Sequence, residues 1–198
     1  MSVYETHLRF RKEELENKVV LDLGAGPEAK FAKQLKESGI EANVISLSPD
    51  FSEKKYRRNV QGSFPEGTHI SATGQSLPLK NESCDRIFAF HIFEHLSGED
   101  LLKCISEMAR VLKLKGKATL GPIPDIPGIF LPNIEALMGN ENLKKELADS
   151  GIDITKEKIP EDVFLIPTMK IYSSDGDAFG ERLHDVPGYN LVLTKIGK

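Results

Sequence analysis

Three features that would assign this sequence to a special class are missing from it. The 198 residues contain only two cysteines, Cys84 and Cys104, which stand far apart, so we expect no disulfide framework and a reducing, cytoplasmic location. The formal net charge is −4, which gives no overall positive field for nucleic acid. No apolar run approaches the length of a membrane span, and the mixed-charge segment 1–18 does not have the pattern of a signal peptide. We therefore expect neither a membrane nor a nucleic acid as partner.

The composition that is present is that of an ordinary globular protein. Hydrophobic residues make up 39% and charged residues 28% of the chain. Its length suits one domain with a core large enough to be stable alone, and no convincing linker interrupts it. We therefore predict a single domain over residues 1–198, with residues 1–17 as a short helical extension.

Strand patterns alternate with helix patterns through the first two thirds of the chain. Apolar, β-branched runs predict strands at 18–24, 42–48, 68–74, 86–92 and 117–123. Amphipathic periodicity predicts helices at 29–38, 50–60 and 98–114. This alternation is typical of a parallel sheet that is covered by helices on both faces.

The last third, residues 121–198, follows a different pattern. Residues 121–132 are rich in glycine and proline and predict a loop, and residues 133–151 predict a helix that Gly139 interrupts. Two further strand candidates, 163–172 and 189–196, suggest an antiparallel pair added to the sheet. The loop 121–132 and the polar connection 173–188 are candidate walls of a substrate cleft.

The stretch from Asp22 to Pro27, DLGAGP, stands where the first strand turns into the first long helix. Glycines at such a turn let the chain bend sharply and let a ligand approach the backbone, and ligands of α/β sheets bind at the carboxyl ends of the strands. The string GAGPEA also matches the dinucleotide fingerprint, which leaves an oxidoreductase with a nicotinamide cofactor as one alternative. A tight turn without a ligand is another.

Taken in order, DLGAGP, GQSLPLKNESCDRIFAFHIFEHL and EMARVLKLKGKATL resemble the class I S-adenosylmethionine-dependent methyltransferases of the small-molecule type with an LP, D and EHL signature. The resemblance covers about residues 18–120. It implies a Rossmann-like, doubly wound α/β fold whose mostly parallel seven-stranded sheet has an antiparallel C-terminal strand. It also implies S-adenosylmethionine as cofactor and a small-molecule methyl acceptor.

The resemblance assigns cofactor contacts to particular positions of this chain. Asp22 with the backbone of Gly24, Ala25 and Gly26 would hold the methionine part of the cofactor. The remaining contacts would come from the second strand end, the segment before the LP motif and the fourth strand end: Ser46, Leu47, Thr73, Gly74, Gln75 and Phe90.

Two of these positions depart from the family pattern. Ser46 stands where an acid usually accepts both ribose hydroxyls, and Thr73 stands where a second acid usually accepts from adenine. A charged hydrogen bond contributes about 1.5–3 kcal/mol and a neutral one about 1 kcal/mol. The two losses therefore predict cofactor binding weaker by about one to three orders of magnitude. Asp50 is the nearest acid to Ser46 on the following turn, and we expect the geometry of that turn to keep it away from the ribose.

The segment HIFEH, residues 91–95, lies at the expected end of the fourth strand. His91 is the first candidate for a catalytic general base and His95 the second. The alternative is a purely structural role, in which Glu94 and His95 orient the following loop. We expect no metal, although His91, Glu94 and His95 together offer ligands that would suit a transition metal.

The sequence thus favours a methyltransferase and leaves, besides the oxidoreductase named above, one rival that is not an enzyme. A degenerate methyltransferase fold, acting as a binding or regulatory protein, would explain why Ser46 and Thr73 replace acids. Cofactor affinity without turnover would favour this rival.

Overall fold

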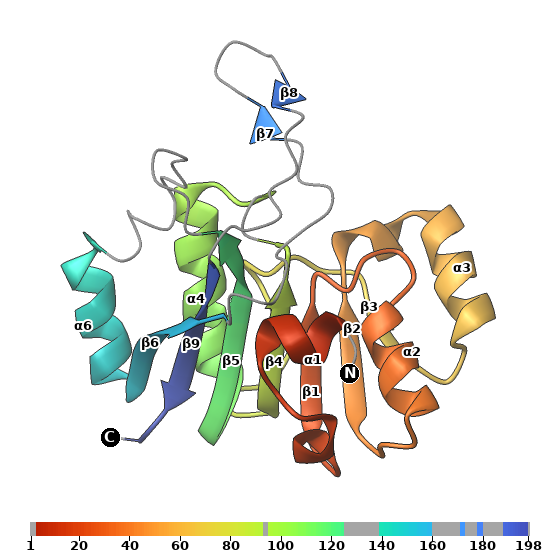
Figure 1. The fold of residues 1–198 in the computed structure, drawn as a ribbon, viewed down its shortest axis with the longest axis horizontal. Coiled ribbons are helices and arrows are strands. Elements are labelled where there is room, and N and C mark those ends of the chain that lie inside the picture. The colour runs from red at the N-terminus through yellow and green to blue at the C-terminus, as the bar shows by residue number, and fades with distance from the viewer. Residues whose placement is uncertain are drawn as a thin grey trace.

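A seven-stranded sheet in the order β3-β2-β1-β4-β5-β9-β6 forms the centre of the computed structural model (Figure 1). The structure describes residues 3–92, 95–124, 139–159, 171–172, 178–179 and 188–197. Parallel pairing joins the first five strands, whereas β9 runs antiparallel to both β5 and β6. The bounds are β1 Val19–Leu23, β2 Asn43–Leu47, β3 Thr68–Ile70, β4 Cys84–Phe90, β5 Leu112–Pro124, β6 Ile152–Lys158 and β9 Gly188–Lys195. The predicted mostly parallel, seven-stranded sheet with an antiparallel C-terminal strand is confirmed.

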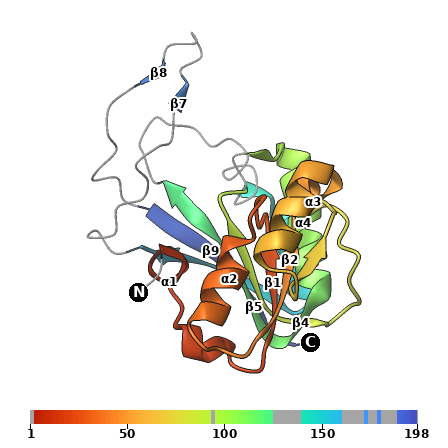
Figure 2. The same cartoon turned by 90° about the vertical axis from the view of Figure 1, so that its right-hand side faces the viewer.

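Helices cover both faces of this sheet (Figure 2). One face carries α1 (Val3–Leu8), the 3-10 turn η1 (Lys12–Leu15) and α2 (Lys30–Glu37), and the other carries α4 (Gly98–Val111) and α6 (Glu141–Asp149). Side chains of β1 alternate accordingly: Val20 packs in the cluster with Phe31 of α2, and Leu21 in the cluster with Leu101 of α4. The two clusters are separate apolar cores above and below one sheet.

The segment after β2 forms a 3-10 turn, η2 (Pro49–Ser52), followed by α3 (Lys54–Ser63). The helix predicted over 50–60 is thus confirmed from Lys54 on and wrong before it, because Glu53 is extended between the two elements. Phe51 of η2 and Val60 of α3 are buried together in a small third cluster. This cluster fixes the turn against the rest of the fold.

Three other predicted bounds differ from the observed ones. β3 ends at Ile70 rather than at residue 74, and α4 ends at Val111 because Leu112 is already extended and begins β5. β4 ends at Phe90, since His91 adopts a left-handed conformation with a φ of 55°. β4 therefore stops one residue before the histidine that we expected within it.

β6 is a strand that the sequence did not indicate. It pairs with β9 along Ile152–Lys158, and its outer residues are mostly exposed. Charged residues protect such an edge strand from pairing with other chains. The same residues interrupt the apolar pattern from which a strand is predicted. The predicted partner of 189–196, the segment 163–172, lies outside the described residues except for β7 (Ile171–Tyr172), which pairs with β8 (Ala178–Phe179). The prediction of that pair was wrong in part, because β9 pairs with β5 and β6.

Candidate functional site

A cavity of about 520 Å³ lies at the carboxyl ends of β1, β2 and β4. β1 stands between β2 and β4, and the connecting helices α2 and α4 lie on opposite faces, so this is the topological switch point of the sheet. Described residues lining the cavity come from five segments: Leu23, Gly24, Gly26, Leu47, Ser48, Pro49, Asp50, Thr73, Gly74, Gln75, His91, Ile92, His95 and Leu96.

The turn after β1 requires glycine at its first position. Gly24 has a φ of +80°, and a Cβ built on it would lie 2.1 Å from Cγ2 of Ile92. The amides of Gly24 and Ala25 both donate to the carbonyl of Leu47, at 2.9 and 3.0 Å, which ties the turn to the end of β2. A side chain at position 24 would thus collide with Ile92, whereas a Cβ on Gly26, which also lines the cavity, would meet no heavy atom within 4 Å.

Two buried polar side chains lie next to each other behind this turn. Asp22 and Ser46 are register partners in β1 and β2, are 3% and 0% exposed, and do not line the cavity. Oδ2 of Asp22 and Oγ of Ser46 make no hydrogen bond within the described part of the chain. Burial raises the pKa of Asp22 to about 7. A donor or a cation reaching Asp22 would therefore relieve an unfavourable environment.

The aromatic side chain of Tyr4 lies near Asp22 from the side of α1. Burial and the nearby carboxylate of Asp22 raise the pKa of Tyr4 above its usual value. The Tyr4 ring packs against Phe90, with ring centroids 5.0 Å apart, and Phe90 is not among the residues that line the cavity. Phe90 therefore lies in an aromatic cluster under α1.

The end of β2 brings Asp50 into the cavity wall. The buried Ser48 hydroxyl accepts a hydrogen bond from the amide of Asp50 at 3.2 Å, and Pro49 begins the 3-10 turn between them. Asp50 lines the cavity while Ser46 does not. We expected the turn to keep Asp50 away from the ribose, but the turn at Ser48 and Pro49, directly after β2, places Asp50 in the cavity wall.

The segment Thr73–Gln75 is positioned by the residues of the LP motif and α4. The guanidinium of Arg110 donates to the carbonyls of Leu77 and Leu79 and to both carboxylate oxygens of Glu107. The Glu107 carboxylate in turn accepts from the amide of Leu77 at 2.8 Å, and the hydrogen bond from Arg110 lowers the pKa of Glu107. Arg110 and Glu107 therefore form a clamp that fixes the loop beside the cavity.

Gln75 has one free acceptor at the cavity. Its side chain hydrogen-bonds to Asp100, which together with the Ser97 hydroxyl lowers the pKa of Asp100. Its buried Oε1 has no partner within the described residues. Gly74, next to it, approaches α4 so closely that a Cβ would lie 2.7 Å from Sγ of Cys104.

Both candidate histidines line the cavity. The amide of His91 donates to the carbonyl of Gly121 at 3.2 Å, and its ring packs edge-on against Phe90 at 4.3 Å. His95 is exposed, and its amide donates to the carbonyl of Ile92. Glu94 lies outside the described residues, so the metal alternative is untested, and the described residues contain no group of three metal-ligating side chains.

The predicted cofactor residues thus divide into two sets. Gly24, Gly26, Leu47, Thr73, Gly74 and Gln75 line the cavity, as do His91 and His95. Asp22, Ala25, Ser46 and Phe90 lie behind its wall. Ser48, Asp50, Ile92 and Leu96 were not predicted. A serine followed by proline at the end of a strand is the signal that could have placed the turn at Ser48. Of the candidate substrate walls 121–132 and 173–188, residues 121–124 form the end of β5 rather than a loop, and Gly188 begins β9. The remaining residues of both segments, apart from Ala178–Phe179, lie outside the described residues.

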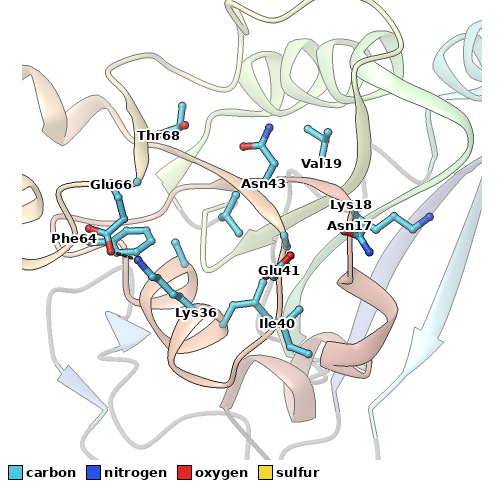
Figure 3. A pocket seen from close by; sticks show the side chains of 15 residues that line it. Asn17, Lys18, Val19, Lys36, Ile40, Glu41, Asn43, Phe64, Glu66 and Thr68 are labelled. Carbon is cyan, nitrogen blue, oxygen red and sulfur yellow. Dashed lines mark hydrogen bonds and ion pairs between the residues drawn. The ribbon is translucent and has the colours of Figure 1, made fainter.

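A second hollow, of about 580 Å³, lies at the opposite ends of the strands (Figure 3). Val19, Asn43 and Thr68, which begin β1, β2 and β3, line it. Its charged residues Lys36 and Glu66 pair with each other, and Lys36 also lies over the ring of Phe64. No buried side-chain polar atom among its described lining residues lacks a partner. The cavity at the carboxyl ends, by contrast, is lined by Gln75, whose buried Oε1 has no partner among the residues that the structure describes.

The chain resembles proteins described as methyltransferases in its sequence. The protein family described as "Methyltransferase domain" has a sequence pattern that matches residues 21–120, which is half of the chain. An uncharacterized methyltransferase of Mycobacterium ulcerans is 30% identical over 118 residues, which cover 60% of this chain and 44% of that protein. The chain thus matches less than half the length of this relative.

Solved structures resemble the fold over most of the chain. The cyclase SpnF has a TM-score of 0.63 at 16% identity, covering 98% of this chain and 79% of SpnF. A didemethyltoxoflavin N1-methyltransferase of Burkholderia thailandensis, solved with its substrate and S-adenosylhomocysteine, has a TM-score of 0.54 at 12% identity, covering 92% of this chain and 72% of that protein. At these identities the likeness shows the fold alone. No helix within the described residues is long and apolar enough to cross a membrane.

Proposed function

The chain belongs to the methyltransferase domain family, whose enzymes use S-adenosylmethionine, and we propose that it transfers the methyl group of this cofactor to a small-molecule acceptor. The observation that carries the proposal is the cavity at the carboxyl ends of β1, β2 and β4. The backbone of glycine residues forms part of its lining. Its volume of about 520 Å³ is in the range of small-ligand sites.

The residues present fit such a cofactor. Gly24 and Gly26 line the cavity, the space beside Gly26 is open, and Asp22 carries a buried carboxylate oxygen without a partner among the described residues. An α-ammonium group near Asp22 would give it a charge-assisted hydrogen bond and favour its ionised form. Asp22 and the turn Gly24–Gly26 would hold the methionine part, and Leu47, Thr73, Gly74 and Gln75 would surround the adenosine part.

S-adenosylmethionine supplies a methyl group that its positive sulfur makes electrophilic. The task of this chain is to align a nucleophile with that methyl group and to exclude water. His91, at the end of β4 and in the cavity wall, would accept the proton that an oxygen or nitrogen nucleophile of the acceptor loses. His95 is the second candidate for this role.

The second candidate function is a binding or regulatory protein that holds the cofactor without turnover. The burial of Ser46 behind the cavity wall favours it, because this side chain offers the ribose no acid and no exposed hydroxyl. The name of SpnF, a cyclase, also illustrates that this fold serves chemistry other than methyl transfer.

Calorimetric titration with S-adenosylmethionine and S-adenosylhomocysteine, with NAD in parallel, tests the proposal. We expect micromolar binding of the first two ligands and none of NAD. A panel of small acceptors and a methyltransferase assay that detects S-adenosylhomocysteine then separate the two candidates. Turnover on any acceptor excludes the binding protein, whereas failure of both sulfur ligands to bind would overturn the proposed function.

A further inference from the structure

We propose that Asp50 accepts hydrogen bonds from the ribose hydroxyls of the bound nucleoside, in the place where the family uses an acid at the position of Ser46. This inference rests on the proposed function, since it names a contact of the same cofactor site. It concerns how this chain binds the ribose, because the chain lacks the acid at the end of β2 that usually binds it.

The first argument is chemical. A ribose presents two neighbouring hydroxyl donors, and an ionised carboxylate is the side chain that accepts both with charge-assisted hydrogen bonds. Among the described residues that line the cavity, Asp50 is the one with a carboxylate. The other lining side chains are apolar, neutral or histidine.

The second argument is the rigidity of the turn that carries Asp50. Ser48 on one side is 2% exposed, and its hydroxyl accepts from the amide of Asp50. Phe51 on the other side is also 2% exposed, and its ring lies 5.6 Å from that of His69. The amide of Glu53 donates to the carbonyl of Asp50 at 2.9 Å. The backbone of Asp50 is thus held between two buried neighbours, and little ordering is needed on binding.

The third argument is the position of Ser46. Its hydroxyl is fully buried, does not line the cavity and lies beside Asp22 in register. Its neutral hydroxyl could accept only one uncharged hydrogen bond in place of the two charge-assisted ones of an acid. Asp50, four residues after Ser46, is the acid nearest to the end of β2 that lines the cavity.

The test is a calorimetric cycle with S-adenosylhomocysteine and its 2′-deoxy and 3′-deoxy analogues. We expect the native protein to lose about tenfold in affinity for each missing hydroxyl, or about 1.4 kcal/mol. The variant Asp50→Asn should bind S-adenosylhomocysteine about tenfold more weakly and distinguish the three ligands by no more than about threefold. Asp50→Glu, which keeps the charge, should retain part of the discrimination. Glu53→Gln, an exposed carboxylate three residues on, is the matched control and should behave as the native protein does.

The outcomes separate this inference from the proposed function. If the native protein binds none of these ligands, the proposed function fails, and the inference fails with it. If the native protein binds S-adenosylhomocysteine and Asp50→Asn keeps both its affinity and its preference for the hydroxyls, the function stands and the role of Asp50 is overturned. An equal loss in Glu53→Gln would also overturn it, because the effect would then reflect general charge.

Discussion

Asp22 is the residue at which stability and the site conflict. Its carboxyl group is buried, one of its oxygens has no partner in the described part of the chain, and its pKa is raised to about 7 by burial. The unfolded chain ionises this group near pH 4, so the folded state keeps a proton that the unfolded state has lost. The contribution of Asp22 to stability therefore falls as the pH rises from about 4 to 7. Asp22 thus weakens the fold at neutral pH and lies next to a candidate site. This combination favours a role for Asp22 in ligand binding.

The variant Asp22→Asn removes this ionisation and keeps a similar shape. We expect the free energy of unfolding of the variant, relative to the native protein, to rise between pH 4 and pH 7 by roughly 2–4 kcal/mol. Urea unfolding at several pH values measures the difference. Parallel stability curves for the two proteins would contradict the expectation. Binding of S-adenosylmethionine by the same variant should be weaker, since its ammonium group loses a charged partner.

At the scale of elements, two motifs of the family resemblance act through structure rather than through chemistry. Arg110 and Glu107 on α4 hold the loop with Leu77 and Leu79, which follows Thr73–Gln75. Asp85 at the start of β4 accepts from the amide of Val19 and from Lys113. Although burial opposes it, the hydrogen bond from Lys113 lowers the pKa of Asp85. The contacts of Asp85 thus tie β4 to β1 and β5, and those of Arg110 and Glu107 tie α4 to the loop.

The clamp can be tested by replacing Arg110 with methionine. This change leaves the carbonyls of Leu77 and Leu79 and the carboxylate of Glu107 without their donor, so we expect a loss of about 2–3 kcal/mol in unfolding free energy. Ligand affinity should fall as well, because the loop also positions Gln75. Lys144→Met, which breaks an exposed ion pair with Glu141 on α6, is the control and should change stability by about 0.5 kcal/mol or less. Equal effects of the two variants would show that Arg110 forms only a surface pair.

At the scale of the whole molecule, the last strand joins distant parts of the chain. β9 lies between β5 and β6 and contributes Leu191 and Leu193 to the larger core cluster. The buried Asn190 on the same strand donates from Nδ2 to the carbonyl of His7 at 2.7 Å. α1 at the start of the chain is thus fastened to β9 near its end.

Leu193→Ala should therefore destabilise the whole protein. This side chain is fully buried, and truncating it leaves a cavity in the core, so we expect a loss of about 2–5 kcal/mol. Ile196→Ala, three residues on at a side chain that is 66% exposed, should cost less than about 0.5 kcal/mol. Chemical unfolding of both variants measures the contrast. A small loss at Leu193 would mean that β9 adds little to the cooperative core.

The sequence by itself determined the alternating strands and helices and the glycine turn after β1, because buried strands and amphipathic helices have distinct hydrophobic periods. It also placed Gly24, Gly74 and His91 at the carboxyl ends of strands, where the cavity lies. These features depend on residues close together in the chain, and local patterns carry that information.

Only the tertiary structure decided which of the predicted residues face the cavity. Asp22 and Ser46 lie behind its wall and Asp50 lies within it, since the turn at Ser48 and the burial of Phe51 set the direction of the chain. It also decided the pairing of β9 with β6, an edge strand whose exposed, charged side chains give no hydrophobic signal. Such features arise from contacts between segments far apart in sequence, to which local propensity contributes little.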